Sequence, residues 1–298
     1  MWFKNASLLR LPADFSLPTE PDEALTAQAL RSPGPLELET RGFISPFGDG
    51  GALSHSSGGA VLLHLGTEAR LLPSSVVRDA LDDKFAAHEA KTGRKPGKRL
   101  RAEMRDAVLG ELLPRAFIQR SRTPGYFDPV SKLLIVDSSS DKACETFASV
   151  LREALGSFPS RPLATEASLP LLMTEWLIAG QPPEGFALGD ECELKDPSDN
   201  TSQIKCKRHD LSADEVREHA RVGKQVSQLS LVFDDRLSFV LDAKMKLRKL
   251  KFLDIVADQL DAQDGADQAT VLDAEFTLMS LELRRLLERL DAILRFVD

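Results

Sequence analysis

The sequence predicts an α+β fold in which a sheet-based body carries a projecting, basic helical segment. Three patterns predict this fold: strand-like runs separated by turn residues in the N-terminal third, helical apolar spacing beyond residue 74, and an amphipathic C-terminal helix. With 42% apolar and 28% charged residues among 298, the chain has a globular composition, which excludes wholesale disorder and collagen. This length is enough for one large domain or two ordinary ones.

The order of the predicted elements divides the chain into three regions. Residues 1–74 and 118–160 are expected to form an N-terminal α+β body, and residues 75–117 a basic, finger-like helical insertion. Residues 161–298 are expected to form a C-terminal α+β region.

Short strands and turns are expected first, because residues 31–60 hold three prolines and seven glycines. Residues 60–65 have the composition of a buried strand, and 68–72 are expected to pair back on it as a hairpin. A helix begins at Ser74 or Ser75, either of which is a candidate N-cap, and its apolar pattern ends near residue 88. A second helix is expected at 101–113, before Pro114.

The middle of the chain alternates between helical and extended patterns. The predicted elements are a strand at 133–136, a helix from its cap Asp141 to Gly156, a linker at 158–164, a helix at 170–178 ended by Gly180, and an extended segment at 186–194.

The C-terminal part predicts short strands followed by the long helix. The elements are a strand at 204–207, a helix opened by the capping box Ser212 and Glu215, strands at 229–233 and 237–241 joined at Asp234 and Asp235, a strand or strand-to-helix segment at 244–252, and an amphipathic helix capped by Asp273.

Membrane, secretory and disulfide classes find no support in the sequence. It has no apolar run of the ~18–20 residues that a bilayer span needs, and its start lacks the pattern of a secretory signal. We therefore expect a cytoplasmic protein. Cys144, Cys192 and Cys206 form no C-x-x-C pair and are expected to be free thiols.

The strongest local feature is the basic run at residues 91–105. It holds seven basic residues and one acid, a net charge of +6. Because the whole chain has a net charge of −8, the residues outside this run have a net charge of −14. Phosphates pair with such cations and release condensed counterions. The density of the run and its lack of compensating acids favour binding of a polyanion over a solvated loop.

A second basic feature spans 244–251, where Lys244, Lys246 and Arg248 alternate with apolar residues. If this segment is a strand, these cations share an outer face while Met245 and Leu247 face the core. The alternation ends at Lys249, which indicates a bulge or a helix start. Residues 204–207 repeat the arrangement. Two alternatives stay open. The lysines form a cationic surface along the backbone of a DNA duplex, or they lie on a solvated sheet edge and prevent another strand from pairing with it.

A third feature is the segment 112–122, where Arg115, Arg120 and Arg122 extend the basic character. From the residues alone, Phe117 within it is interpreted as a core residue. Catalytic signals are weak: the chain has no G-x-S-x-G, H-E-x-x-H or G-x-G-x-x-G motif, and its histidines lack metal-ligand spacing. The sequence does not exclude a nuclease, because the carboxylates of a nuclease need to cluster in space and not along the chain.

Short segments distributed from end to end resemble the bacterial recombination-associated RdgC family. Their order, their spacing and the total length carry the resemblance. The segments are Met1-Trp2-Phe3-Lys4-Asn5, Leu72-Pro73-Ser74, Leu113-Pro114-Arg115-Ala116-Phe117, Leu155-Gly156-Ser157 with Pro159, Thr174-Glu175-Trp176, Asp210-Leu211, Leu250-Lys251-Phe252, and Asp273-Ala274-Glu275-Phe276 with Leu278-Met279.

The resemblance implies a nucleoid-associated homodimer that closes as a ring around duplex DNA and limits the access of the recombinase RecA. It implies a projecting finger, and it places Arg115 and Phe117 near the finger and the closure of the ring. It also implies DNA contact near Lys207, Arg208 and His209.

We therefore expect a non-enzymatic DNA-binding protein with little sequence preference and no cofactor or metal. Duplex DNA is the expected ligand, and single-stranded DNA stays open. The expected DNA-binding residues are Lys91, Arg94, Lys95, Lys98, Arg99, Arg101, Arg115, Phe117, Lys205, Lys207, Arg208, His209, Lys244, Lys246, Arg248, Lys249 and Lys251. The alternatives are a metal-dependent nuclease using the same basic surfaces, and an interaction scaffold whose C-terminal helix binds a partner.

Overall fold

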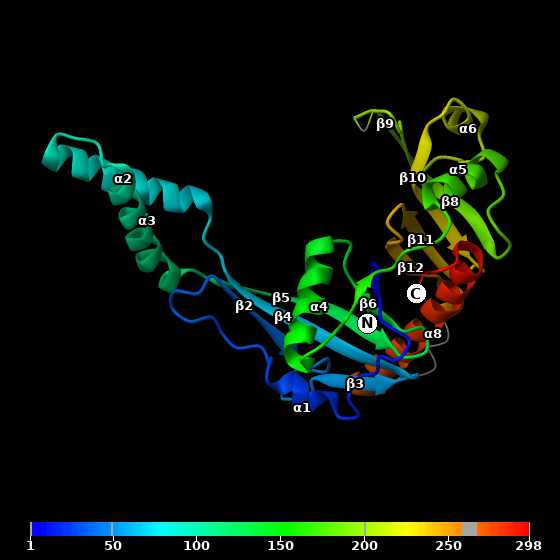
Figure 1. Cartoon of the computed structure of the whole chain (residues 1–298), viewed down its shortest axis with the longest axis horizontal. Coiled ribbons are helices and arrows are strands. Elements are labelled where there is room, and N and C mark those ends of the chain that lie inside the picture. The colour runs from blue at the N-terminus through cyan, green and yellow to red at the C-terminus, as the bar shows by residue number, and fades with distance from the viewer. Residues whose placement is uncertain (1, 49, 200, 258–266, 298) are drawn as a thin grey trace.

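A computed structural model of the chain describes residues 2–48, 50–199, 201–257 and 267–297, and two antiparallel sheets organise them (Figure 1). The first sheet comprises β1 (Ser7–Arg10), β2 (Glu39–Ile44), β3 (Ser54–Ser57), β4 (Ala60–Arg70), β5 (Ile118–Asp128), β6 (Leu133–Val136) and β7 (Arg161–Pro162). The second comprises β8 (Phe186–Lys195), β9 (Gln203–Lys207), β10 (Gln225–Phe233), β11 (Leu237–Asp242) and β12 (Leu247–Phe252). The predicted α+β class is confirmed.

The seven-stranded sheet is covered on both faces. Its order is β2–β4–β5–β6–β1–β7, with β3 also paired to β4. Because successive strand residues face opposite sides, Leu62 and Ile135 join the larger core with the C-terminal helix α8 (Gln268–Leu294). Leu63 and Leu134 join a smaller core beneath α4 (Asp141–Leu155). The short helix α1 (Pro21–Thr26) contributes its one buried residue, Leu25, to this second core.

Helix α8 joins the two sheets. The five-stranded sheet has the order β12–β11–β10–β8–β9, and its inner residues share the larger core with α8. Arg284 donates hydrogen bonds to both carboxylate oxygens of Asp128 at 2.9 Å, at the end of β5. Arg236, in the β10–β11 turn, donates from Nε to Glu282 at 2.8 Å. These partners are needed because a buried carboxylate without one is costly.

A helical hairpin lies at the far end of the β4–β5 ribbon, away from the rest of the molecule (Figure 1). It consists of α2 (Ser74–Thr92), α3 (Lys98–Leu112) and the 3-10 turn η1 (Leu113–Arg115). The predicted hairpin at 68–72 is wrong, because β4 continues to Arg70 and pairs with β5 from Val61 opposite Phe127 to Arg70 opposite Ile118. In α2 no residue is buried, and in α3 only Val108 is. The hairpin therefore projects without a core of its own.

Several predicted helix starts are corrected. Ser140, not Asp141, caps α4 by accepting a hydrogen bond from the Ala143 N–H, and Asp267, not Asp273, caps α8 through Thr270. Neither predicted serine caps α2, whose N-cap position is Pro73. The capping box at Ser212 does not form, because the Ser212 hydroxyl donates to Asp210 at 2.6 Å; such local turns compete with helix capping. Helix α6 (Asp214–Arg221) starts after Ala213.

Other predicted elements are confirmed. Helix α5 (Leu169–Ala179) ends at Gly180 in the left-handed conformation, and β10 and β11 join through Asp234 and Asp235. The predicted linker at 158–164 is instead part of the body, because Phe158 is buried and β7 pairs with β1. A short helix, α7 (Asp254–Ala257), follows β12. No helix in the described ranges combines the length and apolarity of a membrane span.

Candidate nucleic-acid interface

The basic run at 91–105, called the tip from here on, caps the far end of the helical hairpin. It contains the end of α2, the loop 93–97 and the start of α3. Gly93 ends α2 with φ +68°, a left-handed conformation that favours glycine, and the chain turns there into α3. This turn places the basic residues of both helices at the same end of the projection.

Most tip cations are exposed and have no acidic partner. Within the described residues no ion pair involves Lys91, Arg94, Lys95 or Lys98. Arg99 is paired with Glu103 at 3.0 Å across one helical turn, and both side chains are largely exposed. An exposed pair of this kind contributes little to stability and is screened by salt. The tip therefore presents free positive charge to solvent.

Arg101 has a structural contact within the tip. Its Nε donates to the carbonyl oxygen of Pro96 at 2.9 Å, and its guanidinium lies 5.7 Å from the centre of the Phe85 ring. These contacts hold the loop against α2. The rest of the hairpin is acidic: residues 74–90 and 106–112 together contain two basic and six acidic residues. The positive charge is thus concentrated at the tip rather than spread along the hairpin.

Arg115 and Phe117 lie where the hairpin joins the ribbon. Arg115 is exposed, and Phe117 is 84% exposed, so the prediction that Phe117 belongs to the core is wrong. The Leu71 N–H donates to the Phe117 carbonyl and the Arg70 N–H to the Leu38 carbonyl, which brings three strand ends together. Leu38 and Leu71 are also more than half exposed. The hairpin base therefore carries an exposed apolar patch, defined by Leu38, Leu71 and Phe117.

Two further arginines extend the positive surface along the ribbon. Arg120 and Arg122 alternate on β5 and are exposed, and Arg120 contacts Glu68 at 2.8 Å. Burial lowers the pKa of the neighbouring His64 to about 4, with a smaller contribution from the Arg122 charge. The expected site did not include this pair, although an R-x-R spacing in a strand places both side chains on one face.

On β9 the predicted alternation is present: Lys205 and Lys207 are exposed, while Ile204 and Cys206 are half-buried. Lys205, however, contacts Glu193 of β8 at 3.0 Å, directly opposite in the strand register. His209 contacts Glu215 through Nε2 at 2.9 Å. Arg208 is exposed and lies between them with a positive φ of 52°. Acidic neighbours therefore offset part of this cluster.

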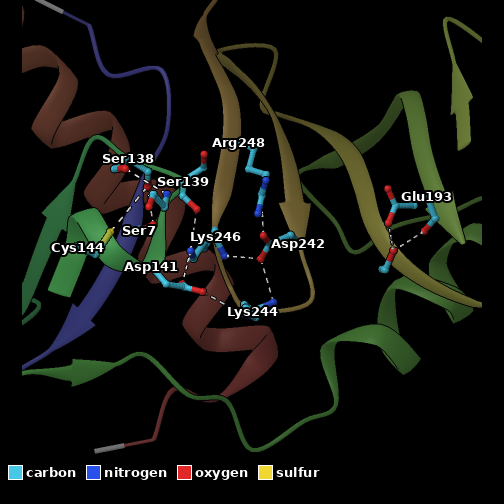
Figure 2. A network of polar contacts seen from close by, with 12 residues as sticks. Ser7, Ser138, Ser139, Asp141, Cys144, Glu193, Asp242, Lys244, Lys246 and Arg248 are labelled. Carbon is cyan, nitrogen blue, oxygen red and sulfur yellow. Dashed lines mark hydrogen bonds and ion pairs between the residues drawn. The ribbon is translucent and has the colours of Figure 1, made fainter. Parts of the chain in front are cut away.

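The segment 243–246 is a turn between β11 and β12, not the strand that the alternation indicated. Asp242 organises it: one carboxylate oxygen accepts from the N–H groups of Lys244 and Lys246, and the other from Arg248 Nε at 2.8 Å (Figure 2). Met245 has a φ of +59°, which breaks the strand alternation. The predicted shared face of Lys244, Lys246 and Arg248 is therefore wrong.

Lys246 points into the molecule. Its side chain is only 9% exposed, and its ammonium donates to the Ser139 carbonyl at 2.8 Å and contacts Asp141 (Figure 2). Lys244 contacts the other oxygen of Asp141 at 2.9 Å. Hydrogen bonds from Lys246 and then Lys244 lower the pKa of Asp141 to about 2. This cluster ties the β11–β12 turn to α4, and Lys246 is not available to an external phosphate.

The last two cations lie on β12. Lys249 adopts a positive φ of 51° and contacts Glu191, which confirms the bulge alternative for this position. Lys251 is exposed. The sequence-predicted residues therefore form three groups: one at the tip, one at the hairpin base with Arg115 and Phe117, and one on the five-stranded sheet and its β11–β12 turn. Among the described residues, no group of three or more His, Cys, Asp or Glu side chains has metal-site geometry.

Comparisons with known proteins agree over the whole chain. A family model described as "Putative exonuclease, RdgC" matches residues 1–296. Proteins named recombination-associated protein RdgC from Xanthomonas oryzae pv. oryzae (strain MAFF 311018), Xanthomonas campestris pv. campestris (strain B100) and Xylella fastidiosa (strain 9a5c) are each 45% identical over 300 aligned residues. Each alignment covers 99% of this chain and 98% of the relative.

Proposed function

The chain belongs to the RdgC family, and from this premise we propose that it is a sequence-nonspecific binder of duplex DNA. In this proposal it acts in recombination without enzymatic activity: it associates with the nucleoid, encloses DNA as a ring-shaped homodimer and limits RecA-mediated strand exchange. The observation that carries the proposal is the tip, where exposed cations without carboxylate partners project from the body.

The chemistry of the tip favours the DNA backbone as ligand. Lysine and arginine at a helix junction contact phosphates, which position a protein on DNA but carry no sequence information. The ribbon arginines Arg120 and Arg122 continue this positive surface towards the body. Such a surface supports binding that depends strongly on salt and little on base sequence.

The apolar patch supports the homodimer. The patch residues Phe117, Leu38 and Leu71 are exposed at the base of the finger-like hairpin. In a monomer their exposed surface therefore contributes no apolar burial to stability. Contiguous exposed apolar side chains mark contact surfaces in globular proteins. In the proposed ring, a second copy covers this patch and closes the ring at the base of the hairpin.

Fluorescence anisotropy with a labelled duplex tests the DNA-binding proposal. If about six phosphates are neutralised, the slope of log K against log salt is about −5. Two duplexes of unrelated sequence should bind equally well, and added protein should slow RecA-driven strand exchange. Absence of binding at low salt would overturn the proposal.

A substitution at the patch tests the ring. Phe117→Ser should lower the molecular mass measured by light scattering from dimer towards monomer, or weaken retention on circular DNA relative to linear DNA. Because Phe117 is 84% exposed, the folded chain should tolerate the change. An unchanged mass together with unchanged retention contradicts the proposed role of the patch.

An exonuclease is the second candidate, because the matching family model carries that word in its description. End-labelled duplex and single strands incubated with the protein and Mg²⁺ or Mn²⁺ separate the two functions. Release of labelled nucleotides that follows the protein through purification supports the enzyme, and intact strands support the non-enzymatic binder.

A further inference from the structure

A second basic surface, which also carries aromatic side chains, lies beside the start of the chain, away from the tip. The segment before β1 runs along β12: Ala6 and Leu247 exchange backbone hydrogen bonds of 2.7 and 2.9 Å, and the Leu250 N–H donates to the Lys4 carbonyl at 2.9 Å. Residues 2–5 and 249–252 together line a hollow of about 730 Å³. We call it the Trp2 hollow.

Two aromatic rings form one wall of this hollow. The ring centres of Trp2 and Phe252 are 4.4 Å apart, and their planes are inclined by 37°. Both side chains are partly buried and pack against the larger core, so they are anchored from behind. Their remaining exposed surface is therefore a supported aromatic platform rather than a mobile pair of side chains.

Lysines surround the aromatic wall. Lys4 and Lys251 are exposed, and within the described part of the chain no ion pair involves Lys251. Two carboxylates lie beside these lysines: Glu191 contacts Lys249, and Asp137 accepts hydrogen bonds from the backbone N–H groups of Lys4 and Asn5 at 3.0 and 2.8 Å. The hollow therefore combines a π surface with net positive charge at its rim.

We propose that the Trp2 hollow binds unpaired nucleotides of single-stranded DNA, with one base stacked on the Trp2–Phe252 wall and the adjoining phosphates on Lys4 and Lys251. This inference rests on the proposed DNA-binding function and extends it to a second kind of strand. A base in a duplex has both faces covered by its neighbours, whereas an unpaired base offers a free face. Aromatic stacking with flanking lysines tolerates any base, since every base has a π face.

Tryptophan fluorescence gives a direct test, because the chain has two tryptophans, Trp2 and Trp176. Trp176 is 8% exposed on α5 and serves as an internal reference. Short oligo(dT) should quench the emission of the wild-type protein, and a DNA hairpin of matched length should quench it far less. Trp2→Leu should abolish the quench.

The affinity measurement uses the full chain and matched variants. We expect Trp2→Leu to weaken oligo(dT) binding by about tenfold and Trp2→Phe to recover most of that loss, while duplex affinity stays within about twofold. Lys251→Glu, at an exposed position, is a second probe of the hollow and should weaken oligo(dT) binding more than duplex binding. Lys142→Glu makes the same charge change at an exposed position on α4 and should affect both ligands alike.

The outcomes separate the two proposals. If Trp2→Leu and Lys251→Glu bind oligo(dT) as the wild type does while duplex binding persists, the hollow is not a nucleotide site and the duplex-binding function stands. If the wild-type protein binds neither ligand, both proposals fail. Should Trp2→Leu fail to fold, the Lys251→Glu and Lys142→Glu pair decides the question.

Discussion

At the tip, Lys95 and Lys98 are exposed with no carboxylate partner in the described residues, whereas Lys205, Lys244 and Lys249 on the five-stranded sheet each contact one. The tip is a projection with a single acid among fifteen residues, and that acid, Glu103, pairs with Arg99. The sheet cations lie beside strands and helices from other parts of the chain. The same residue types therefore present mostly free charge at the tip and partly compensated charge on the sheet, where Lys207, Arg208 and Lys251 have no ion pair within the described residues.

This contrast bears on which region binds phosphate. A free cation exchanges only water and counterions when a phosphate arrives, while a paired cation must also leave its carboxylate or keep that negative charge close to the DNA. We therefore expect the tip to dominate duplex affinity.

Neutralising four unpaired tip cations together should have the largest effect. In the combined variant Lys91→Gln, Arg94→Gln, Lys95→Gln and Lys98→Gln, the salt slope of duplex binding should decrease in magnitude by about 3 to 4. Anisotropy titrations at several salt concentrations measure it. Thermal unfolding is the control, because all four side chains are exposed and the fold should be retained. A slope equal to that of the wild type would remove the tip from the interface.

Neutralising paired cations should matter less. The variant Lys205→Gln, Lys244→Gln and Lys249→Gln removes three positive charges whose partners are Glu193, Asp141 and Glu191. We expect its salt slope to change by less than about one, measured in the same titration. A change as large as that of the tip variant would show that carboxylate pairing does not suppress phosphate binding here.

Removing one carboxylate should turn a paired cation into a free one. Asp141→Asn releases Lys244 and leaves the nearly buried Lys246 with the Ser139 carbonyl alone. We expect stronger duplex binding, and an unfolding free energy lower by on the order of 1 kcal/mol, because Asp141 is itself mostly exposed. Denaturant titration and anisotropy measure the two effects.

The pH dependence of that variant provides its own check. The pKa of Asp141 is lowered from 3.8 to about 2 in the folded chain, so its contribution is complete above 3.8 and is lost as the pH falls towards 2. The stability difference between wild type and Asp141→Asn should shrink in that window. Glu145→Gln, one turn along α4, is the matched control, because it removes the same negative charge. No ion pair of Glu145 with a lysine occurs in the described residues, so its duplex affinity should stay closer to that of the wild type.

The smallest effect concerns the ribbon between the two regions. Burial is the main cause of the lowered pKa of His64, about 4, and the Arg122 charge adds to it. Arg122→Gln should therefore raise this pKa slightly, as measured by NMR titration. The unfolded state binds a proton at His64 near pH 6.5, whereas the folded state binds it only near pH 4. His64 therefore lowers the free energy of unfolding as the pH falls from 6.5 to about 4. In Arg122→Gln the lower end of this pH range should move upward. A fall in the pKa would show that Arg122 does not act on His64 through charge.

Local patterns predicted most elements of the fold. Strands β6, β8, β10 and β11 and helices α4 and α5 lie close to their predicted ranges, because each has an apolar periodicity and turn residues at its ends. The failures share a cause: β4 continues past the predicted turn because β5, about fifty residues away, pairs along its whole length. The predicted capping box at Ser212 failed because its hydroxyl donates to the neighbouring Asp210 instead.

The candidate site divides in the same way. The concentration of positive charge at 91–105 follows from the sequence alone, because composition fixes how many acids are near a basic residue along the chain. Three features became visible only in the folded chain: Lys246 is buried against Asp141, Phe117 is exposed, and Trp2 packs against Phe252. These partners are distant in sequence, and pairing and burial depend on distances in space, which residue spacing along the chain does not contain.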